Sequence, residues 1–381
     1  YTKSPIRNFR TGIKRSNQLL SKELMYQLDS DRPKLIGFSD SREDAAQQAL
    51  GIEREHHRDM VRMLFIEHIE EYCSIMQELK SYLDIHKDDE KVLKELNKNP
   101  GKFEVLPRIK DIIRDFRDEE PIDHYFNNFI SLGDFLGNNT LDGHLVKKMV
   151  KLGLNPSGVA SCHQYFGNNT SRYHWSEAFD FNTGSLKSNV IVNDNTNYIS
   201  NALLNLQSEI YANSFGKYLS VSLQDAGVGY ISCAHEDVDN LQGNKREAYY
   251  ILQKMLPQGT DVYDFVDSFI RILGNNFRYD SAEYELSDWN SYNDFNRAVK
   301  APIIRFAEIH RIDADDLGNA LYEFLHHFNI SGNATKLQFN NLCFRMMAKD
   351  EVYYRCIKCG RIHLHRGIGI CTNNACMQEL P

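Results

Sequence analysis

Four cysteines close to the C-terminus restrict the possible folds of this chain more than any other feature of its sequence. Cys356, Cys359, Cys371 and Cys376 follow the pattern C-x2-C-x11-C-x4-C. Two close pairs on two turns can bring four thiolates to one tetrahedral ion, which is how proteins hold structural zinc. Four thiolates saturate that ion, so the pattern predicts a closed zinc ribbon that stabilises the fold and has no position open for catalysis.

The remaining cysteines and several histidines receive simpler interpretations. Because the four thiolates complete the site, we expect His363 and His365, which lie between the two pairs, to be surface groups. His56 and His57 lie in a charged helical stretch and are expected to face solvent. The other four cysteines are scattered and are expected to be small buried thiols: Cys73, Cys162, Cys233 and Cys343.

Length and composition indicate a folded protein with more than one structural unit. The chain has 381 residues, of which 42% are hydrophobic and 25% are charged, so it can fill real cores. It contains no long uncharged apolar stretch of the kind that crosses a membrane, and no N-terminal secretion signal. We therefore expect a cytoplasmic protein without membrane contact, and a chain that is a piece of a longer one.

The spacing of apolar residues predicts a mainly α fold of the α+β class. An apolar run at 34–38 has the length of a buried strand, and the hydroxyls of Ser39 and Ser41 can cap a helix that continues to about Leu50. A separate amphipathic helix is expected from about Glu53 to Leu83. Helical spacing recurs at 106–117, 121–136, 141–152, 200–222, 244–256, 261–274 and 302–328. The expected segments are a basic linker (1–33), a βα unit (34–52), a mainly helical insertion (53–336, loop-rich at 153–200) and strands with the zinc ribbon (337–381).

Charge is distributed unevenly along the chain. The formal net charge is −8, yet residues 1–15 carry five cations and residues 355–366 carry four, in both cases without an acid. The rest of the chain therefore holds −8 − 5 − 4 = −17. Basic patches of this kind can bind phosphate groups even on an anionic protein.

No self-contained catalytic motif is found. The sequence lacks G-x-x-x-x-G-K-[ST] and H-E-x-x-H, and no convincing Ser/His/Asp or Cys/His set emerges. The acidic stretch Arg117–Asp123 does not follow an apolar strand and is interpreted as a solvated acidic turn. The stretch Asp225–Tyr230 is too short for a dinucleotide fingerprint and is interpreted as a turn. We therefore expect this chain alone to be inactive as an enzyme.

The stretch KLIGFSDSREDAAQQALGIEREHHRDMVRMLF, at 34–65, resembles the start of the second RecA-like domain of large bacterial superfamily 2 helicases. These DEAD/DEAH-type proteins often end in a DUF1998 region. Their motif IV reads F-[ST]-D-S-R-Q-D-A-A and is matched from Phe38 to Ala46, except that Glu43 replaces the usual Gln. More loosely, the preceding basic segment is similar to the linker between the two motor domains, and the C-terminal cysteines are similar to the family's zinc ribbon.

The resemblance implies a middle and C-terminal portion of an ATP-dependent DNA helicase. ATP and Mg²⁺ would bind only in the complete parent protein, because the Walker motifs are missing here. DNA would be contacted through its backbone, independently of sequence, by Arg10, Lys14, Ser39, Ser41 and Arg42. A helix N-terminus with hydroxyls and an arginine is suited to phosphate. Such helicases occur in anti-phage defence systems of the DISARM and Druantia types, so a defence-system protein is a further expected partner.

Two other classes of function remain open. The helical insertion and the ribbon can form a non-catalytic scaffold that docks a partner subunit. The His- and Asp-rich insertion can alternatively hold a metal-dependent nuclease, although no acidic triad has motif spacing.

Overall fold

The structure, a computed structural model, describes most of the chain from Arg42 onward. The described ranges are 42–85, 105–106, 108–126, 129–158, 165–168, 171–188, 198–216, 221–280, 286–332, 335–348 and 350–381, with a few isolated positions besides. The predicted strand at 34–38 and its hydroxyl turn lie outside them.

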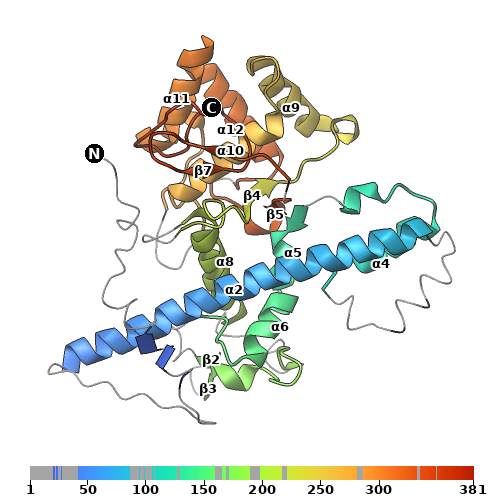
Figure 1. Ribbon diagram of the computed structural model, residues 1–381, viewed down its shortest axis with the longest axis vertical. Helices are drawn as coiled ribbons and strands as arrows, with labels where there is room; N and C mark the ends of the chain where they lie inside the picture. The colour runs from blue at the N-terminus through green and yellow to red at the C-terminus, as the bar shows by residue number, and fades with distance from the viewer. Residues whose placement is uncertain are drawn as a thin grey trace.

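One long helix organises the molecule. Helix α2 (Arg42–Ile85) contains 44 residues and runs across the whole structure in Figure 1. The sequence analysis expected two helices, one ending near Leu50 and another beginning near Glu53; that expectation is wrong, because the helix continues through Gly51 without a break. A single glycine inside a helix costs only about 1 kcal/mol. Packing of α2 along its length offsets this cost.

Helix α2 contributes to two separate hydrophobic cores. Its middle part, including Leu64 and Phe65, enters the main core, where it packs on α6 (His144–Lys151) and α8 (Tyr198–Phe215). Its last turns, including Leu79 and Leu83, enter a smaller core with Val105 and Ile112, the latter from α4 (Ile109–Arg117). The main core lies at the middle of the helix and the smaller one at its C-terminal end.

A small antiparallel sheet lies in the main core. Its order is β1 (Phe129–Ser131), β5 (Leu342–Met346), β4 (Gly229–Cys233), and Phe344 of β5 is opposite both Ile130 and Ile231. Strand β4 is buried along its entire length. Segments more than a hundred residues apart in the sequence therefore form one sheet, and the C-terminal segment supplies its central strand.

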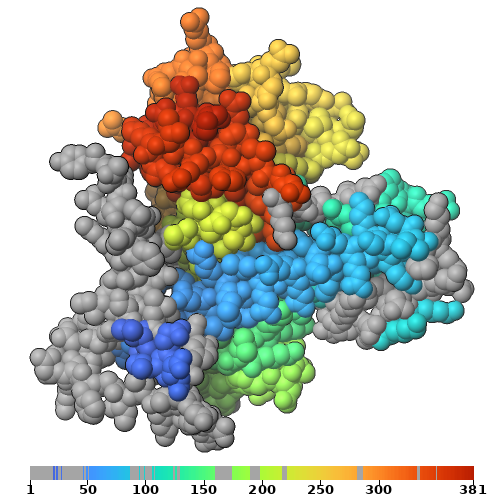
Figure 2. All heavy atoms as spheres, in the orientation of Figure 1, coloured from blue at the N-terminus to red at the C-terminus, as the bar shows by residue number. Residues whose placement is uncertain are grey.

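Four helices follow β4 and build the other half of the main core. They are α9 (Gly243–Met255), α10 (Val262–Asn275), α11 (Arg297–His310) and α12 (Ala314–His327). Aspartate or asparagine side chains cap three of them: Asp261, Asn296 and Asp313 accept backbone N–H groups of the first turn. Helix α10 is the most buried and packs on β4. Figure 2 shows the C-terminal segment, in red, next to the orange helices α11 and α12.

The remaining elements are short. They comprise α5 (Leu132–Leu136), the hairpins β2 (Tyr165–Asn168) with β3 (Ser171–His174) and β6 (Tyr354–Arg355) with β7 (Ile362–His363), and single 3-10 turns at Asp123–Phe126, Trp175–Ala178, Val238–Asn240, Tyr292–Asp294 and Phe339–Asn341.

The described residues are thus mainly helical, as predicted. Every pair of named strands among them is antiparallel, so a parallel RecA-like sheet is not part of the described structure. Over the same ranges, no helix is both long and apolar enough to cross a lipid bilayer.

Candidate metal centre

The four C-terminal cysteines converge on one point. The Sγ atoms of Cys356 and Cys376 are 3.6 Å apart, those of Cys359 and Cys371 are 3.5 Å apart, and all four lie within 4.8 Å of one another. A disulfide would need about 2.05 Å. Four ligands about 2.3 Å from a tetrahedral zinc ion lie about 3.8 Å from each other, so the separations fit a shared ion.

Two tight turns place these sulfurs. In the first, the backbone N–H of Gly360 donates to the Cys356 carbonyl at 2.9 Å, and Gly360 takes a positive φ of 78° that glycine adopts without strain. In the second, the Cys376 N–H donates to the Asn373 carbonyl at 2.7 Å. Each turn carries one close pair of the sequence pattern, and the β6–β7 hairpin connects with the first turn.

The thiols differ in how readily they ionise. Burial opposes ionisation of Cys356, but hydrogen bonds from the backbone of Cys359 and Lys358 lower its pKa to about 7. Burial raises the pKa of Cys371 and of Cys376. A cation at the centre supplies the positive charge that deprotonates such thiols. The donor set therefore fits a metal ion of the zinc class, with all four positions taken by sulfur.

His363 and His365 are buried, contrary to the expectation that they are surface groups. They are 3% and 8% exposed, and the ring of His365 lies 4.6 Å from that of Tyr230 in β4. Burial lowers the pKa of His363 to about 2 and that of His365 to about 4, so both rings are neutral. The spacing of the cysteines could not reveal this, because the partner of the His365 ring, Tyr230, lies in β4, far from the ribbon in the sequence.

A buried arginine joins the ribbon to the helical core. Arg271 of α10 donates from Nη1 to the Ile362 carbonyl at 2.6 Å and from Nη2 to Asp225 Oδ1 at 2.8 Å. The same carboxylate oxygen accepts the Ile362 N–H at 3.2 Å. The stretch at Asp225–Tyr230 does begin in a turn, but its aspartate also fixes strand β7 to helix α10.

A second polar cluster lies at the end of β4. The buried Asp267 of α10 accepts the Cys233 N–H at 2.8 Å, the Ser232 hydroxyl at 2.6 Å and an N–H from His235 Nε2 at 3.0 Å. A catalytic relay requires the histidine to contact the serine and the aspartate through different ring nitrogens. Here Ser232 donates directly to Asp267, so the cluster is a satisfied structural network and not a nucleophile with its base.

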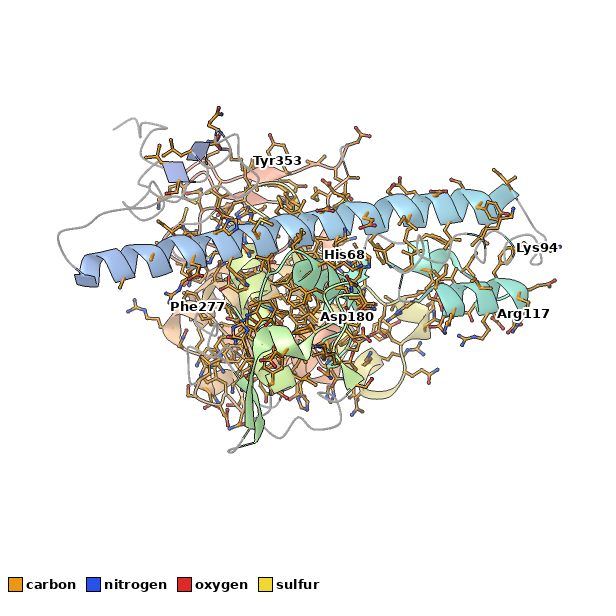
Figure 3. The ribbon with its side chains drawn as sticks, turned by 90° about the horizontal axis from the view of Figure 1, so that it is seen from below. His68, Lys94, Arg117, Asp180, Phe277 and Tyr353 are labelled. Atoms are coloured by element: carbon orange, nitrogen blue, oxygen red, sulfur yellow. The ribbon has the colours of Figure 1, made fainter. Side chains whose placement is uncertain are left out.

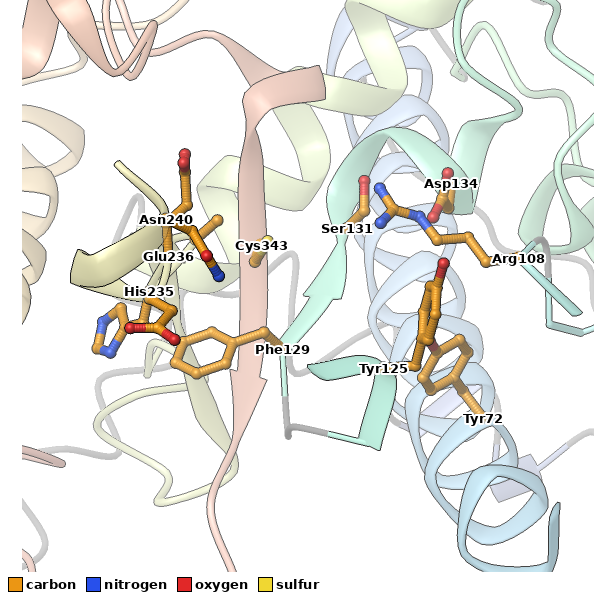
Figure 4. A pocket seen from close by; sticks show the side chains of 12 residues that line it. Tyr72, Arg108, Tyr125, Phe129, Ser131, Asp134, His235, Glu236, Asn240 and Cys343 are labelled. Atoms are coloured by element: carbon orange, nitrogen blue, oxygen red, sulfur yellow. The ribbon is translucent and has the colours of Figure 1, made fainter. Parts of the chain in front are cut away.

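A cavity of about 450 Å³ lies beside this cluster. In Figure 4, Arg108, Tyr125 and Asp134 form one wall, His235 and Glu236 form the other, and Cys343 lies between them. Burial raises the pKa of the Cys343 thiol to about 12, so it is not a nucleophile at neutral pH. His235 of the cavity wall also belongs, with Cys233 and Asp267, to a group of potential metal ligands whose atoms lie within 4.8 Å of one another.

The predicted DNA contacts fall outside the described residues. This holds for Arg10, Lys14, Ser39 and Ser41, and for the side chain of Arg42, whose backbone begins α2.

His57, within the stretch that resembles the helicases, is buried, whereas the sequence analysis expected it to face solvent. Its Nε2 lies 2.9 Å from the Asn155 carbonyl, and burial lowers the pKa of the ring. Asn155 belongs to the glycine- and proline-containing loop after α6, where it organises a turn by accepting the Ser157 N–H. Sequence alone places His57 and this loop nearly a hundred residues apart; the fold brings them into contact.

Comparisons with known proteins return nothing for this chain: no family model matches it, and no curated protein and no solved structure is similar to it. The helicase resemblance at Phe38–Ala46 therefore stays a prediction from the sequence.

Proposed function

We propose that this chain is a segment of an ATP-dependent DNA helicase or translocase, to which it contributes backbone contacts with DNA and a structural zinc module. The zinc module is supported by the convergence of Cys356, Cys359, Cys371 and Cys376 within 4.8 Å. The motor role is supported by the motif IV resemblance at Phe38–Ala46. ATP and Mg²⁺ would be bound by the complete parent protein.

Zinc would act here as a clamp and not as a catalyst. Four sulfurs leave no position for water or substrate, and binding to such sites is worth roughly 10–16 kcal/mol at neutral pH. The ion would hold together the two cysteine-bearing turns, one before and one after β7. Strand β7 is itself hydrogen-bonded to Arg271 and Asp225. Metal binding would thereby fix the C-terminal segment on α10.

The start of α2 supports the proposed phosphate contact. A long helix carries a partial positive charge and free N–H groups at its first turn, where an anion binds favourably. Helix α2 begins at Arg42, immediately after Ser39 and Ser41 in the sequence. The same helix continues into the main core, so a DNA contact there would be directly connected to the folded body.

Metal analysis tests the zinc module. We expect one tightly held zinc ion per chain after dialysis against a weak chelator, and its loss from Cys371→Ser. Cys343→Ala is the matched control, since it removes another largely buried thiol without touching the cluster. A Cys371→Ser protein that retains a full equivalent of zinc would contradict the four-cysteine site.

Salt dependence of DNA binding tests the motor role. If Arg10, Lys14 and Arg42 contact phosphates, changing all three to Ala should reduce the slope of log K against log salt by about two to three units. The control changes three exposed cations elsewhere, Lys187, Lys254 and Arg297, to Ala. No salt-sensitive binding to single-stranded or forked DNA would reject the motor role and favour a scaffold.

A further inference from the structure

Another group of potential metal ligands lies where α2 meets α6, away from the cysteines. His68 and Glu71 are three residues apart on α2, so their side chains project from the same face of that helix. His144 is the first residue of α6, which packs against this face. One ligand atom from each of the three residues lies within 4.8 Å of the others. Figure 3 shows His68 midway along α2, on the side of the packed core.

His68 is the least explained of the three residues. It is only 3% exposed, and its buried Nδ1 has no hydrogen-bond partner. Its ring is held between that of Phe135, at 4.8 Å, and that of His144, which stacks on it at 5.0 Å. A buried polar atom without a partner costs about 1–3 kcal/mol, and native proteins rarely leave one unused.

The carboxylate of the group already attracts a cation. Glu71 Oε2 lies 3.6 Å from His144 Nε2 and 2.5 Å from the ammonium of Lys148, on the next turn of α6. Lys148 also contacts Glu67, one turn back on α2, at 3.1 Å. Lys148 can therefore keep a carboxylate partner if another cation takes its place at Glu71.

We propose that His68, Glu71 and His144 bind one divalent transition-metal ion of the zinc class, at a site independent of the cysteine cluster. Two imidazole nitrogens and one carboxylate oxygen are a three-ligand set that zinc accepts, with the fourth position left to water. Imidazole donors select zinc, copper, nickel or iron and do not select calcium or magnesium, which prefer all-oxygen sites.

The site needs only local adjustment to close on an ion. Nitrogen ligands about 2.05 Å from a tetrahedral ion lie about 3.4 Å apart, compared with separations of up to 4.8 Å here. Glu71 is partly exposed and can turn toward the ring nitrogens, while α2 and α6 hold the two histidines. The Lys148 ammonium is the main competitor of the ion for the Glu71 carboxylate.

Zinc titration of the full chain tests the proposal. Protein that already retains its cysteine-bound zinc is titrated with Zn²⁺ in competition with a chromophoric chelator. We expect one additional equivalent to bind the wild type, and none to bind His144→Ala or Glu71→Gln, which alter partly exposed side chains. His327→Ala is the matched control: it removes another partly exposed histidine that pairs with a glutamate, Glu323 at 3.3 Å, and should bind like the wild type.

A variant of Lys148 distinguishes metal binding by the three residues from a purely structural role. Lys148→Met removes the competing ammonium, so the Zn²⁺ affinity of the second site should rise by about tenfold, within the range that groups next to metal ligands control. A thermal unfolding midpoint for each variant confirms that it is folded. The proposal is overturned if the wild type binds no second equivalent, if that equivalent persists in both His144→Ala and Glu71→Gln, or if Lys148→Met leaves the affinity unchanged or weaker.

Discussion

Replacement of Arg271 by Met should weaken the attachment of the zinc ribbon to the helical core without removing its metal ligands. Arg271 is 2% exposed and lies between α10 and β7, where it donates to both the Ile362 carbonyl and Asp225. Methionine is of similar length and can fill the same apolar space, but it donates no hydrogen bond. The variant therefore removes the interaction with little loss of packing.

The expected loss of stability comes from the carboxylate of Asp225, which loses its main partner in the variant. Removal of one partner from a buried ion pair costs about 3–5 kcal/mol, because the other charge stays buried without compensation. Asp225 is 25% exposed and keeps Arg361 at 3.9 Å, which places the cost near the lower end, about 3 kcal/mol. Burial favours the neutral form of Asp225, but Arg271 lowers the pKa of this carboxyl overall, so the pKa should rise in the variant.

Urea unfolding at pH 7 measures this loss. The informative comparison is with the double variant Arg271→Met/Asp225→Leu, which removes both charges. We expect it to be less destabilised than Arg271→Met alone, because no buried charge is left unpaired. Zinc content should stay at the wild-type value in both proteins. A cost below about 1 kcal/mol for Arg271→Met, or equal costs for the single and double variants, would refute the role given to this pair.

Two further predictions concern α10. Burial, together with Asp267, raises the pKa of Asp264 to about 6, above the unfolded value of 3.8, so the stability that its protonated form contributes is lost as pH rises through 6. Asp264→Asn should remove a slope of about 1 kcal/mol per pH unit between pH 4.5 and 5.5 in urea unfolding, and the same slope in both proteins would contradict this. Gly274→Ala would place a Cβ 2.3 Å from the Phe215 ring and should cost about 1–3 kcal/mol by overpacking; an unchanged thermal midpoint would show that the ring can move away.

Local sequence patterns predicted several of the helices and the cysteine cluster directly. The helices expected at 141–152, 244–256 and 261–274 correspond to α6, α9 and α10 within a few residues. The stretch at 121–136 was expected to be helical and instead contains β1, because Phe129–Ser131 pairs with β5, more than two hundred residues later. Strand formation of this kind depends on a distant partner, which helical spacing does not register.

The site could be predicted only as far as it is local in sequence. Four cysteines within 21 residues predict a metal site from their spacing alone. The burial of His363 and the role of Asp225 depend on a helix from another part of the chain, since Arg271 contacts β7 and Asp225 together. The group of His68 and His144 likewise joins two helices, and a lone histidine in a helical pattern carries no sign of its partner.

The continuity of α2 has a mechanical consequence. At 1.5 Å per residue, 44 residues span about 66 Å, and Figure 1 shows no break along this length. The helix packs into the main core near its middle and into the smaller core at its C-terminal end. A rotation of about 5° about Phe65, where the main core holds the helix, would move its C-terminal end, about 30 Å away, by about 2.6 Å. Such a rotation leaves Leu64 and Phe65 nearly in place, whereas α4, which packs at that end, would move by a few ångströms.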